Sequence, residues 1–554
     1  MATTRNWFKD VFLFGVILSG LAAVTAYLLA VDRVVTPESF HTTPLTKIRA
    51  ASAKLDQAIN TSIADAQLQS TNRADSSQIF RRLALSLTGS LPSVEELREI
   101  EKIAADEQVH WYVSHLLEDK RTSDYLAERF TRVFVGVEQG PFLIYRRRRF
   151  RTWLSDQFRA NMPYDRICKT MLTSNGIWTD KPQVNFYTYN IIPDVDDETK
   201  PDPIRLAART SRAFLGMRID CLQCHDDFLG TMNLGSADDP VEGTQRHFHA
   251  LASFFSQVKN SVTGIYDDLD ADTYQYKLLD DDEESVIEAQ VPFSEAFDQA
   301  SKNNLRVRLA NWVSHDENLP FARSVVNRVW AIMFGRGFIQ PVDNIPLEGP
   351  FPVALEQLAH DFMTNGYDLH RLIRVIAYSE AFQRSSTADF EILSAHNSHF
   401  AVFPILRLRP EQVAGSIIQS TSLTTIDATS HIISQLTKFG QETDFVDRFG
   451  DLGEDEFNEK SETITQRLLL MNGKMVRERL KSQLNSVTRI ADLSPNMETA
   501  VETIYLATLS RKPTTEESEF FVSQLTDVSS GQRKRKVVDI YWSLINSVEF
   551  VWNH

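Results

Sequence analysis

Two of the three cysteines in this 554-residue chain lie within one five-residue stretch, Cys221-Leu222-Gln223-Cys224-His225. This is the C-x-x-C-H pattern through which haem is covalently attached to protein. Attachment needs two thiols three residues apart, which bond the two vinyl groups, followed by an imidazole that ligates the iron. The motif therefore predicts haem c held by Cys221 and Cys224, with His225 as the proximal iron ligand.

Two other interpretations use the same residues. The thiols of Cys221 and Cys224 could form a disulfide or a redox dithiol, or they could bind zinc together with His225 and a fourth ligand from elsewhere. The sequence contains no second C-x-x-C pair that would complete a zinc ribbon. The third cysteine, Cys168, has no evident partner, and we expect it to be a buried thiol.

A long apolar segment near the N-terminus, residues 11–31, contains no charged side chain. As a helix it would extend roughly 32 Å, enough to cross the hydrocarbon core of a bilayer. Arg5 and Lys9 precede it. By the positive-inside rule, they predict that the short N-terminus lies in the cytoplasm and that the bulk of the chain lies on the periplasmic side of the inner membrane. The alternative is a cleaved signal peptide. We expect an uncleaved single-pass anchor. It would place the bulk of the chain outside the cytoplasm, where haem c is attached.

The rest of the chain has the composition of a globular protein. Hydrophobic residues make up 42% of the sequence and charged residues 24%, with a formal net charge of −16. A chain of this length is expected to divide into two or more domains. The acidic balance disfavours nucleic-acid binding, which depends on Lys and Arg neutralising phosphates.

Helical periodicity dominates the sequence, so we expect a mainly α fold: an N-terminal transmembrane helix followed by two helical extracytoplasmic domains. Clear helical segments in the C-terminal half are residues 305–315, 321–334, 354–364 and 537–552. An acidic run within residues 263–295 lacks the spacing and central glycine of an EF-hand loop and predicts an exposed insertion or linker. The predicted divisions are residues 1–40 as membrane anchor, 41–262 as the domain with the C-x-x-C-H motif, 263–295 as insertion, and 296–554 as C-terminal domain.

Two helix starts carry a capping-box pattern, in which a Ser or Thr side chain and a Glu three residues later satisfy free backbone amides. One is Ser93 with Glu96, after Pro92, and the other is Thr514 with Glu517, after Pro513. We expect a helix to begin at each.

Several motifs together resemble a known pair of domains. The N-terminal set leads into Cys221-Leu222-Gln223-Cys224-His225-Asp226, and the C-terminal set reaches almost to the end of the chain. The chain resembles the planctomycete cytochrome-c-like domain of unknown function, followed by its usual C-terminal planctomycete companion domain. The stretches that carry the resemblance are Phe80-Arg81-Arg82-Leu83, Leu87-Thr88-Gly89, Pro92-Ser93-Val94-Glu95-Glu96, Phe214-Leu215-Gly216, Val326-Asn327-Arg328-Val329-Trp330, Phe334-Gly335-Arg336-Gly337, Leu408-Arg409-Pro410-Glu411-Gln412 and Leu509-Ser510-Arg511-Lys512-Pro513.

The resemblance implies an exported protein with a c-type haem motif and no established reaction for either domain. Members often place a second histidine two residues after the motif imidazole, whereas this chain has Asp227 there, followed by Phe228. One candidate ligand is therefore missing, while the attachment residues are intact.

The second axial ligand decides whether a haem favours electron transfer or ligand binding. His247 and His249, shortly after the motif, are the candidates for this distal ligand, and the alternative is that they are ordinary helix-start or surface residues.

A basic run, Arg146-Arg147-Arg148-Arg149, contrasts with the acidic chain. Arginine forks suit carboxylate, sulfate and phosphate groups, so an anionic glycan, a lipid headgroup or an acidic redox partner are candidate ligands. The alternative is a solvated helix face paired with acidic side chains.

No hydrolase elbow, Walker loop, zinc-protease motif or dinucleotide fingerprint is present, so catalytic residues are unassigned. The leading hypothesis is a membrane-anchored extracytoplasmic c-type haem protein that transfers electrons to an unknown redox partner. The second is a haem-free cell-envelope binding or structural protein with a Cys221–Cys224 disulfide. The third is a haem-dependent oxidoreductase with an open distal site.

Overall fold

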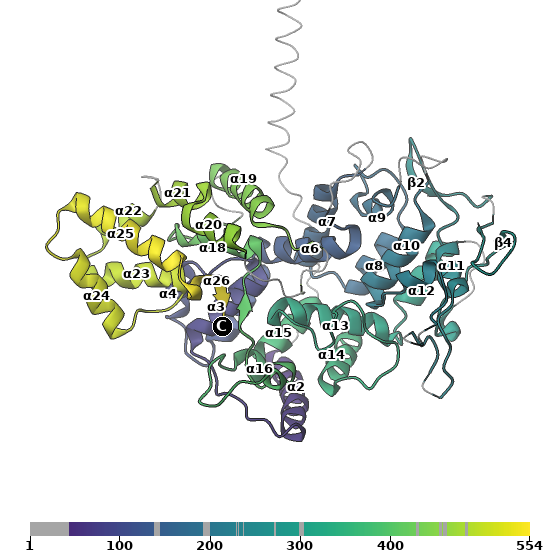
Figure 1. Ribbon diagram of the computed structural model, residues 1–554, viewed down its shortest axis with the longest axis horizontal. Coiled ribbons are helices and arrows are strands. Elements are labelled where there is room, and N and C mark those ends of the chain that lie inside the picture. The colour runs from purple at the N-terminus through teal and green to yellow at the C-terminus, as the bar shows by residue number, and fades with distance from the viewer. Residues whose placement is uncertain are drawn as a thin grey trace, which may run out of the picture. The chain divides into compact units, whose positions relative to one another are not determined.

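The computed structural model describes residues 44–554, apart from residues 138–144, 192–199, 229, 231, 237, 271–272, 299–303, 428–431, 454–456, 458–462 and 482–485. The described part belongs to one compact unit that extends from Thr43 to His554. It is mainly helical, with three short two-stranded sheets among its described residues (Figure 1).

The N-terminal half of the unit is built from short helices joined by tight turns. These are α2 (Leu45–Asp65), α3 (Ser76–Thr88), α4 (Val94–Ile100), α5 (Gln108–Glu118), α6 (Lys120–Val135), α7 (Arg147–Arg159), α8 (Tyr164–Thr173), η1 (Pro182–Val184), α9 (Asn185–Thr188), α10 (Pro203–Thr210), η2 (Ser211–Leu215), η3 (Asp220–Gln223) and α11 (Gln245–Ser253).

Two antiparallel hairpins follow, β1 (Val258–Ser261) with β2 (Gly264–Asp267), and β3 (Gln275–Tyr276) with β4 (Ser285–Val286). The remaining elements are η4 (Glu295–Phe297), α12 (Leu305–Val313), α13 (Leu319–Phe334), α14 (Val353–Thr364), α15 (Leu369–Tyr378), α16 (Glu380–Gln383), α17 (Ser394–Ser398), β5 (Leu406–Arg407), α18 (Pro410–Ser420), α19 (Ile432–Phe449), α20 (Ile464–Asn472), α21 (Lys474–Lys481), α22 (Ser486–Leu493), α23 (Met497–Leu509), α24 (Thr515–Leu525), α25 (Ser530–Ile545), α26 (Val548–Val551) and β6 (Trp552–Asn553).

The predicted C-terminal helices are present with small changes of bounds. The segments predicted at 305–315, 321–334 and 354–364 correspond to α12, α13 and α14. The segment predicted as one helix at 537–552 is divided between α25 and α26, because Ser547 starts a new helix by accepting a hydrogen bond from the amide of Phe550 at 3.3 Å. A local cap therefore interrupts a pattern that hydrophobic periodicity alone predicted to be continuous.

Both predicted capping boxes are confirmed. The Ser93 hydroxyl accepts from the Glu96 amide at 2.9 Å, and the Glu96 carboxylate accepts from the Ser93 amide at 2.7 Å. Thr514 and Glu517 repeat the arrangement at 3.2 and 2.8 Å. Each box satisfies amides at a helix start that have no partner within the helix.

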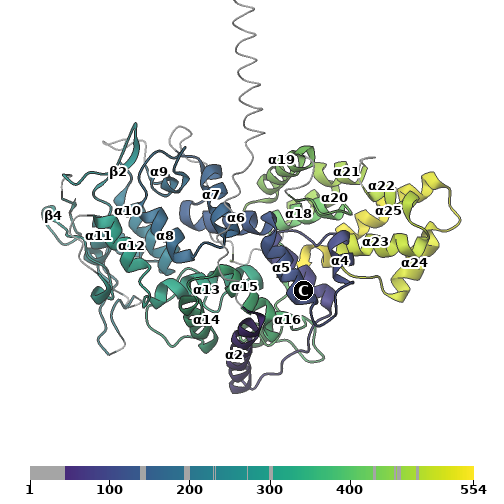
Figure 2. The same cartoon turned by 180° about the vertical axis from the view of Figure 1, so that it is seen from behind.

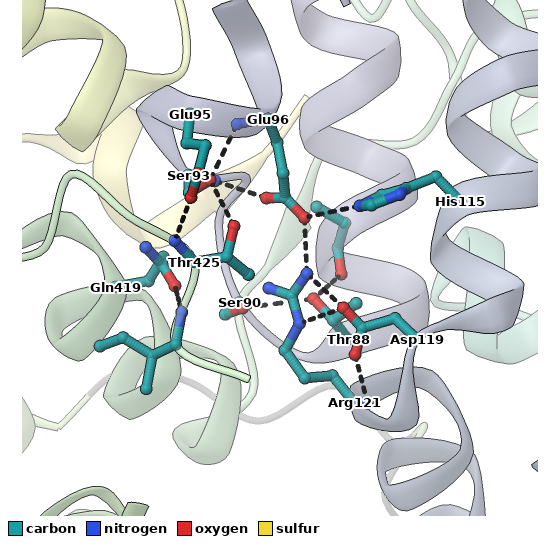
Figure 3. Close-up of polar contacts among 12 residues, drawn as sticks. Thr88, Ser90, Ser93, Glu95, Glu96, His115, Asp119, Arg121, Gln419 and Thr425 are labelled. Atoms are coloured by element: carbon teal, nitrogen blue, oxygen red, sulfur yellow. Dashed lines mark hydrogen bonds and ion pairs between the residues drawn. The ribbon is translucent and has the colours of Figure 1, made fainter. Parts of the chain in front are cut away.

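The first of these boxes belongs to a larger polar cluster (Figure 3). The buried carboxylate of Glu96 pairs with Arg121 at 2.5 Å, and Asp119 binds the same guanidinium. From the C-terminal half, Thr425 reaches the cluster through its hydroxyl, 2.9 Å from that of Ser93. The cluster therefore joins the start of α4 to a loop more than 300 residues away in sequence.

Helices from the two predicted domains pack directly against one another. Contacts join α2 to α14 and α15, α3 to α13, and α8 to α12. Figure 1 shows the early helix α3 beside the C-terminal end of the chain, in agreement with the contacts between α3 and β6, and Figure 2 shows the same end from behind, near the label of α5. The predicted domain boundaries remain a prediction, but the described residues on either side of them share one hydrophobic core.

Two buried arginines of α3 hold the C-terminal segment in place. Arg81 donates to the carbonyl oxygens of Glu549 and Phe550, each at 3.0 Å, and Arg82 donates to that of His554 at 3.0 Å. A guanidinium offers five donors and no acceptor, so carbonyl groups are suitable partners for it inside a protein. These contacts give Arg81 and Arg82, which belong to the family-like stretch, a structural role.

The predicted membrane placement is corrected. Across the part of the chain that the structure describes, no helix has the length and apolar character needed to cross a bilayer. Even the 21-residue α2 has charged side chains along its exposed face, as an amphipathic helix of a globular unit does. The predicted spanning segment, residues 11–31, lies outside the described residues. The fold class of the described residues is mainly α, with no transmembrane helix among them, and the predicted single-pass placement in the inner membrane with the bulk of the chain in the periplasm lacks support.

The acidic segment at 263–295 is more tightly bound to the unit than its composition predicts. Asp267 at the end of β2 is half-buried as a residue, but its side chain is only 8% exposed and pairs with the buried guanidinium of Arg306, with a separation of 2.6 Å between Oδ1 and Nε. Tyr274 packs against the hydrophobic core, and Ile287 is buried. Five other carboxylates of the run are exposed as expected, namely Asp270, Asp280, Asp282, Glu283 and Glu284, whereas Asp268 and Asp281 are half-buried.

Candidate functional site

The C-x-x-C-H motif begins on the 3₁₀ turn η3, which follows α10 and η2; Cys224 caps the C-terminal end of this turn and His225 comes directly after it. Leu222 is fully buried, whereas Cys221 and Cys224 are exposed. Side chains three residues apart nearly eclipse one another in a 3₁₀ helix, so both thiols lie on the outer side of the turn. Leu222 therefore fixes the turn to the core while the two thiols face solvent.

Both thiols are free in the structure. The third cysteine, Cys168 on α8, is buried as predicted, and burial raises the pKa of its thiol well above the usual value. A buried neutral thiol is chemically inert, so Cys168 does not compete for the chemistry of the exposed pair.

The imidazole of His225 is exposed and oriented by its own neighbour. Its Nδ1 lies 2.7 Å from the carbonyl oxygen of Asp226. Because a carbonyl oxygen only accepts, Nδ1 carries the proton, and Nε2 of the neutral ring keeps its lone pair. Histidines that ligate a metal commonly donate their other ring N–H to a carbonyl in this way.

Two aspartates hold the loop that follows the motif. Asp226 accepts a hydrogen bond from the amide of Gln245, at the start of α11, at 2.6 Å. Asp227 is buried and accepts from the amide of Met232, while its own amide donates to the carbonyl of Gly243 at 2.9 Å. Asp227, which occupies the place of a second histidine in the family-like pattern, therefore supports the loop.

Helix α11 supports the motif from behind through Gln223. The Gln223 carbonyl accepts from Nε2 of Gln245 at 3.0 Å and lies 3.1 Å from Nε2 of His249. Nδ1 of His249 lies 2.8 Å from the Tyr274 hydroxyl, and the ring stacks on Tyr276 with centroids 3.6 Å apart. Burial raises the pKa of Tyr274, so its hydroxyl stays protonated and donates to His249.

Neither predicted distal histidine presents an unengaged lone pair in this arrangement. His249 is fully buried, and Nδ1 accepts from Tyr274 while Nε2–H donates to Gln223. In His247, Nδ1 accepts from the amide of Thr244 at 3.1 Å as part of a helix cap, so the neutral ring carries its proton on Nε2. Burial lowers the pKa of both imidazoles. The assignment of a distal ligand remains a prediction.

Comparison with protein families gives two matches. Residues 54–260 match PSCyt2, described as a protein of unknown function (DUF1549), and residues 305–443 match PSD1, described as a protein of unknown function (DUF1553). The chain carries a PSCyt2 domain followed by a PSD1 domain. The resemblance read from the motifs is thereby confirmed, and the C-x-x-C-H motif lies inside the PSCyt2 domain. No curated protein and no solved structure matches the chain.

The structure divides the basic run of the PSCyt2 domain into buried and exposed members. Arg147 is buried and pairs with Glu128 at 2.7 Å, and although burial raises the pKa of Glu128, the guanidinium of Arg147 lowers it well below its usual range. Arg146 lies over the ring of Trp178 at 4.8 Å. Arg148 and Arg149 are exposed. The four therefore do not form one continuous surface patch.

Within the described residues, no group of three or more His, Cys, Asp or Glu side chains is arranged to hold a metal ion. Cys221, Cys224 and His225 are therefore not brought together as the alternative zinc interpretation requires, because a zinc site needs three or four protein ligands at one point. A haem differs because its porphyrin supplies four nitrogen ligands, which leaves only the axial positions to the protein.

Sequence reasoning missed the residues that support the motif. Gln245, His249, Tyr274 and Tyr276 lie more than 20 residues from the turn that they hold. No short-range pattern marks such contacts. His249 was noticed for its chemistry, but only the fold shows that its ring nitrogens are used to orient Gln223.

Proposed function

We propose that this protein is a c-type haem protein whose PSCyt2 domain carries haem on Cys221 and Cys224, with His225 as the proximal ligand, and that it transfers electrons to a redox partner. The observation that carries the proposal is the orientation of His225. Its Nδ1–H is occupied by the carbonyl of Asp226, which leaves the lone pair on Nε2 for iron.

The residues of the turn fit covalent attachment. The two thiols are exposed, unbonded and on one side of a 3₁₀ turn, and the imidazole follows directly after them. Leu222 and Gln223 fix the backbone of the same turn to the core and to α11. The chain therefore presents two nucleophilic sulfurs from a rigid support, which lowers the entropic cost of bonding a large planar group.

The proposed reaction is one-electron transfer, which a bound haem would supply. The protein's own contribution is to hold the imidazole of His225 in one tautomer and to keep the turn rigid. Asp226 has both tasks, since its carbonyl orients His225 and its carboxylate binds the amide of Gln245.

The test is an absorption spectrum and an intact mass of the protein produced with an export signal and a haem c maturation system. We expect a Soret band and a mass increase of one haem, both lost in Cys221→Ala/Cys224→Ala. The matched control is Cys168→Ala, which removes the remaining thiol and should keep both signals. A colourless protein of unmodified mass would overturn the proposal, and a loss of two hydrogens would assign the pair to a disulfide.

A second candidate function is a haem-dependent oxidoreductase with an open distal site. The hydrogen bonds of the two histidines on α11 favour it. His247 and His249 both have Nδ1 engaged as an acceptor. If neither supplies the sixth ligand, small ligands should bind the iron. A spectral shift of the haem protein on adding carbon monoxide or imidazole would support this candidate, and an unchanged spectrum would favour electron transfer alone.

A further inference from the structure

A polar cavity lies directly before the C-x-x-C-H turn and is used by none of the chemistry described above. It has a volume of about 310 Å³ and is lined by Tyr189, Asn190, Arg205, Ala208, Arg209, Arg212 and Asp220. Asp220 is the residue that precedes Cys221 in the chain. The cavity therefore adjoins the candidate haem site.

Helical spacing brings three arginines into this cavity. Arg205 and Arg209 are four residues apart on α10, and Arg212 follows three residues later where the helix continues into η2. Residues three and four apart lie on one face of a helix, so the three guanidinium groups converge on the same space. Asp220 is the one acidic side chain among the lining residues, which leaves an excess of positive charge in a chain whose net charge is −16.

The fold holds two of these arginines in fixed positions. Nη1 of Arg209 donates to the carbonyl of Val133 at 3.1 Å, and its guanidinium carbon lies 5.4 Å from the ring centroid of Tyr189. Nε of Arg212 donates to the carboxylate of Asp343. An arginine already positioned by other contacts loses less side-chain entropy when it binds a ligand.

A buried phenol lies beside Tyr189 at the edge of the cavity. Among the described residues, the hydroxyl of Tyr145 has no hydrogen-bond partner, although the residue is fully buried. Its ring lies 5.2 Å from that of Tyr189, which lines the cavity. Burial raises the pKa of Tyr145, and the guanidinium groups of Arg147 and, to a smaller extent, Arg209 act in the opposite direction. A buried donor without a partner is costly and needs an explanation in a folded protein.

We propose that this arginine cavity binds the oxyanion of a carboxylate or phosphate-like ligand. Arginine forks match the planar or tetrahedral oxygens of such groups, and the volume accommodates one small anion. The anion has two sources, a free solute or the carboxylates that a haem on the neighbouring turn carries. The site itself does not depend on haem attachment, because none of its lining residues is Cys221, Cys224 or His225.

The test uses the full chain with Cys221→Ala/Cys224→Ala, which carries no haem, titrated calorimetrically with citrate and with inorganic phosphate. We expect saturable binding of at least one of these probes. Arg205→Ala and Arg209→Ala should each weaken it by about 10-fold or more, the effect of losing one charge-assisted hydrogen bond. The matched control is Arg166→Ala, an exposed arginine of α8 that is remote in sequence, and it should leave the affinity unchanged.

The same titration on the haem-loaded protein distinguishes the two sources. Loss of binding in that protein assigns the cavity to the carboxylates of the haem, and retained binding assigns it to a free anion. If the loaded protein cannot be produced, the proposed function fails while the titration of the cysteine variant still stands. No saturable binding in the correctly folded cysteine variant, or affinity unaffected by Arg205→Ala and Arg209→Ala, overturns the arginine cavity as an anion site.

Discussion

Nε2 of His249 lies 3.1 Å from the carbonyl oxygen of Gln223, which is the central position of the C-x-x-C-H turn. The same imidazole accepts from Tyr274 and stacks on Tyr276, both of which come from the acidic segment. One buried side chain thus couples the turn that presents the thiols to a segment some 50 residues later in the sequence. Its effect on the candidate haem site is indirect, through the backbone of Gln223.

His249→Phe should make the C-x-x-C-H turn more mobile without creating a cavity in the core. The substitution keeps an aromatic ring against Tyr276 but leaves the Gln223 carbonyl with one donor fewer and the Tyr274 hydroxyl without an acceptor. The expected destabilisation is about 1–3 kcal/mol. Hydrogen exchange over residues 219–228 should accelerate, while His360→Phe on the exposed face of α14 should change neither quantity. Unchanged exchange in the His249 variant would contradict the positioning role.

Asp267→Asn should be strongly destabilising although Asp267 lies in an acidic run. The change leaves the buried guanidinium of Arg306 without its charged partner. Removing one member of a buried ion pair costs about 3–5 kcal/mol. Urea unfolding measures the effect, with Asp282→Asn at an exposed position of the same run as the control. Equal stability of the two variants would show that the segment is solvated throughout.

Ser93→Ala should cost more than Thr514→Ala, although both remove the side chain of a capping box. The loss of a cap alone costs about 0.5–2 kcal/mol. Ser93 also contacts the Thr425 hydroxyl at 2.9 Å, so its removal weakens the link between α4 and the loop after α18 (Figure 3). Denaturant midpoints of the two variants provide the comparison, and the expectation fails if Thr514→Ala is the more destabilising change.

Asp56 on α2 gives a prediction for pH dependence. Burial raises the pKa of Asp56 to about 6, although the amide of Glu380 donates to its carboxylate at 2.8 Å. The folded state therefore binds this proton more tightly than the unfolded chain does, and this group's contribution to stability declines as pH rises from about 4 to about 6. Asp56→Asn removes the charge that burial disfavours.

The stability of Asp56→Asn relative to the wild type should thus increase over that pH interval and reach a plateau above pH 6. Thermal unfolding at pH 4, 5, 6 and 7 measures the difference between the two proteins at each point. A difference that is constant with pH would show that Asp56 titrates alike in the folded and unfolded states.

Short-range patterns in the sequence predicted much of the local structure. The capping boxes at Ser93 and Thr514 are present because a hydroxyl and a carboxylate three residues apart meet the same helix start. The burial of Cys168 follows from the apolar character of a thiol without a partner cysteine, and apolar spacing predicted α13 to within two residues at its start. The predicted transmembrane helix was wrong for the described part of the chain, where no helix is long and apolar enough to cross a bilayer, and its segment, residues 11–31, lies outside that part.

Long-range contacts changed the interpretation of several residues. Arg147 was read as part of a basic surface, but it is buried against Glu128 on the preceding helix. The acidic run predicts a solvated Asp267, but the ion pair with Arg306 leaves its side chain only 8% exposed. In both pairs the partner is brought close by the packing of separate elements, and the Coulomb energy between two charges depends on that distance and on burial.

By itself the sequence determined the chemistry that this chain can present and the family to which its domains belong. Two thiols and an imidazole within five residues are held close together by the local backbone alone. Cys221, Cys224 and His225 were therefore identifiable from the sequence without knowledge of the fold. Only the tertiary structure decided that His249 supports Gln223. It also brought three arginines and Asp220 together around one cavity beside the C-x-x-C-H turn. The physical reason is that a short motif needs only neighbouring residues of the chain. The burial of a side chain, the tautomer of a histidine and the pairing of charges depend on which helices and strands, distant in sequence, pack against one another.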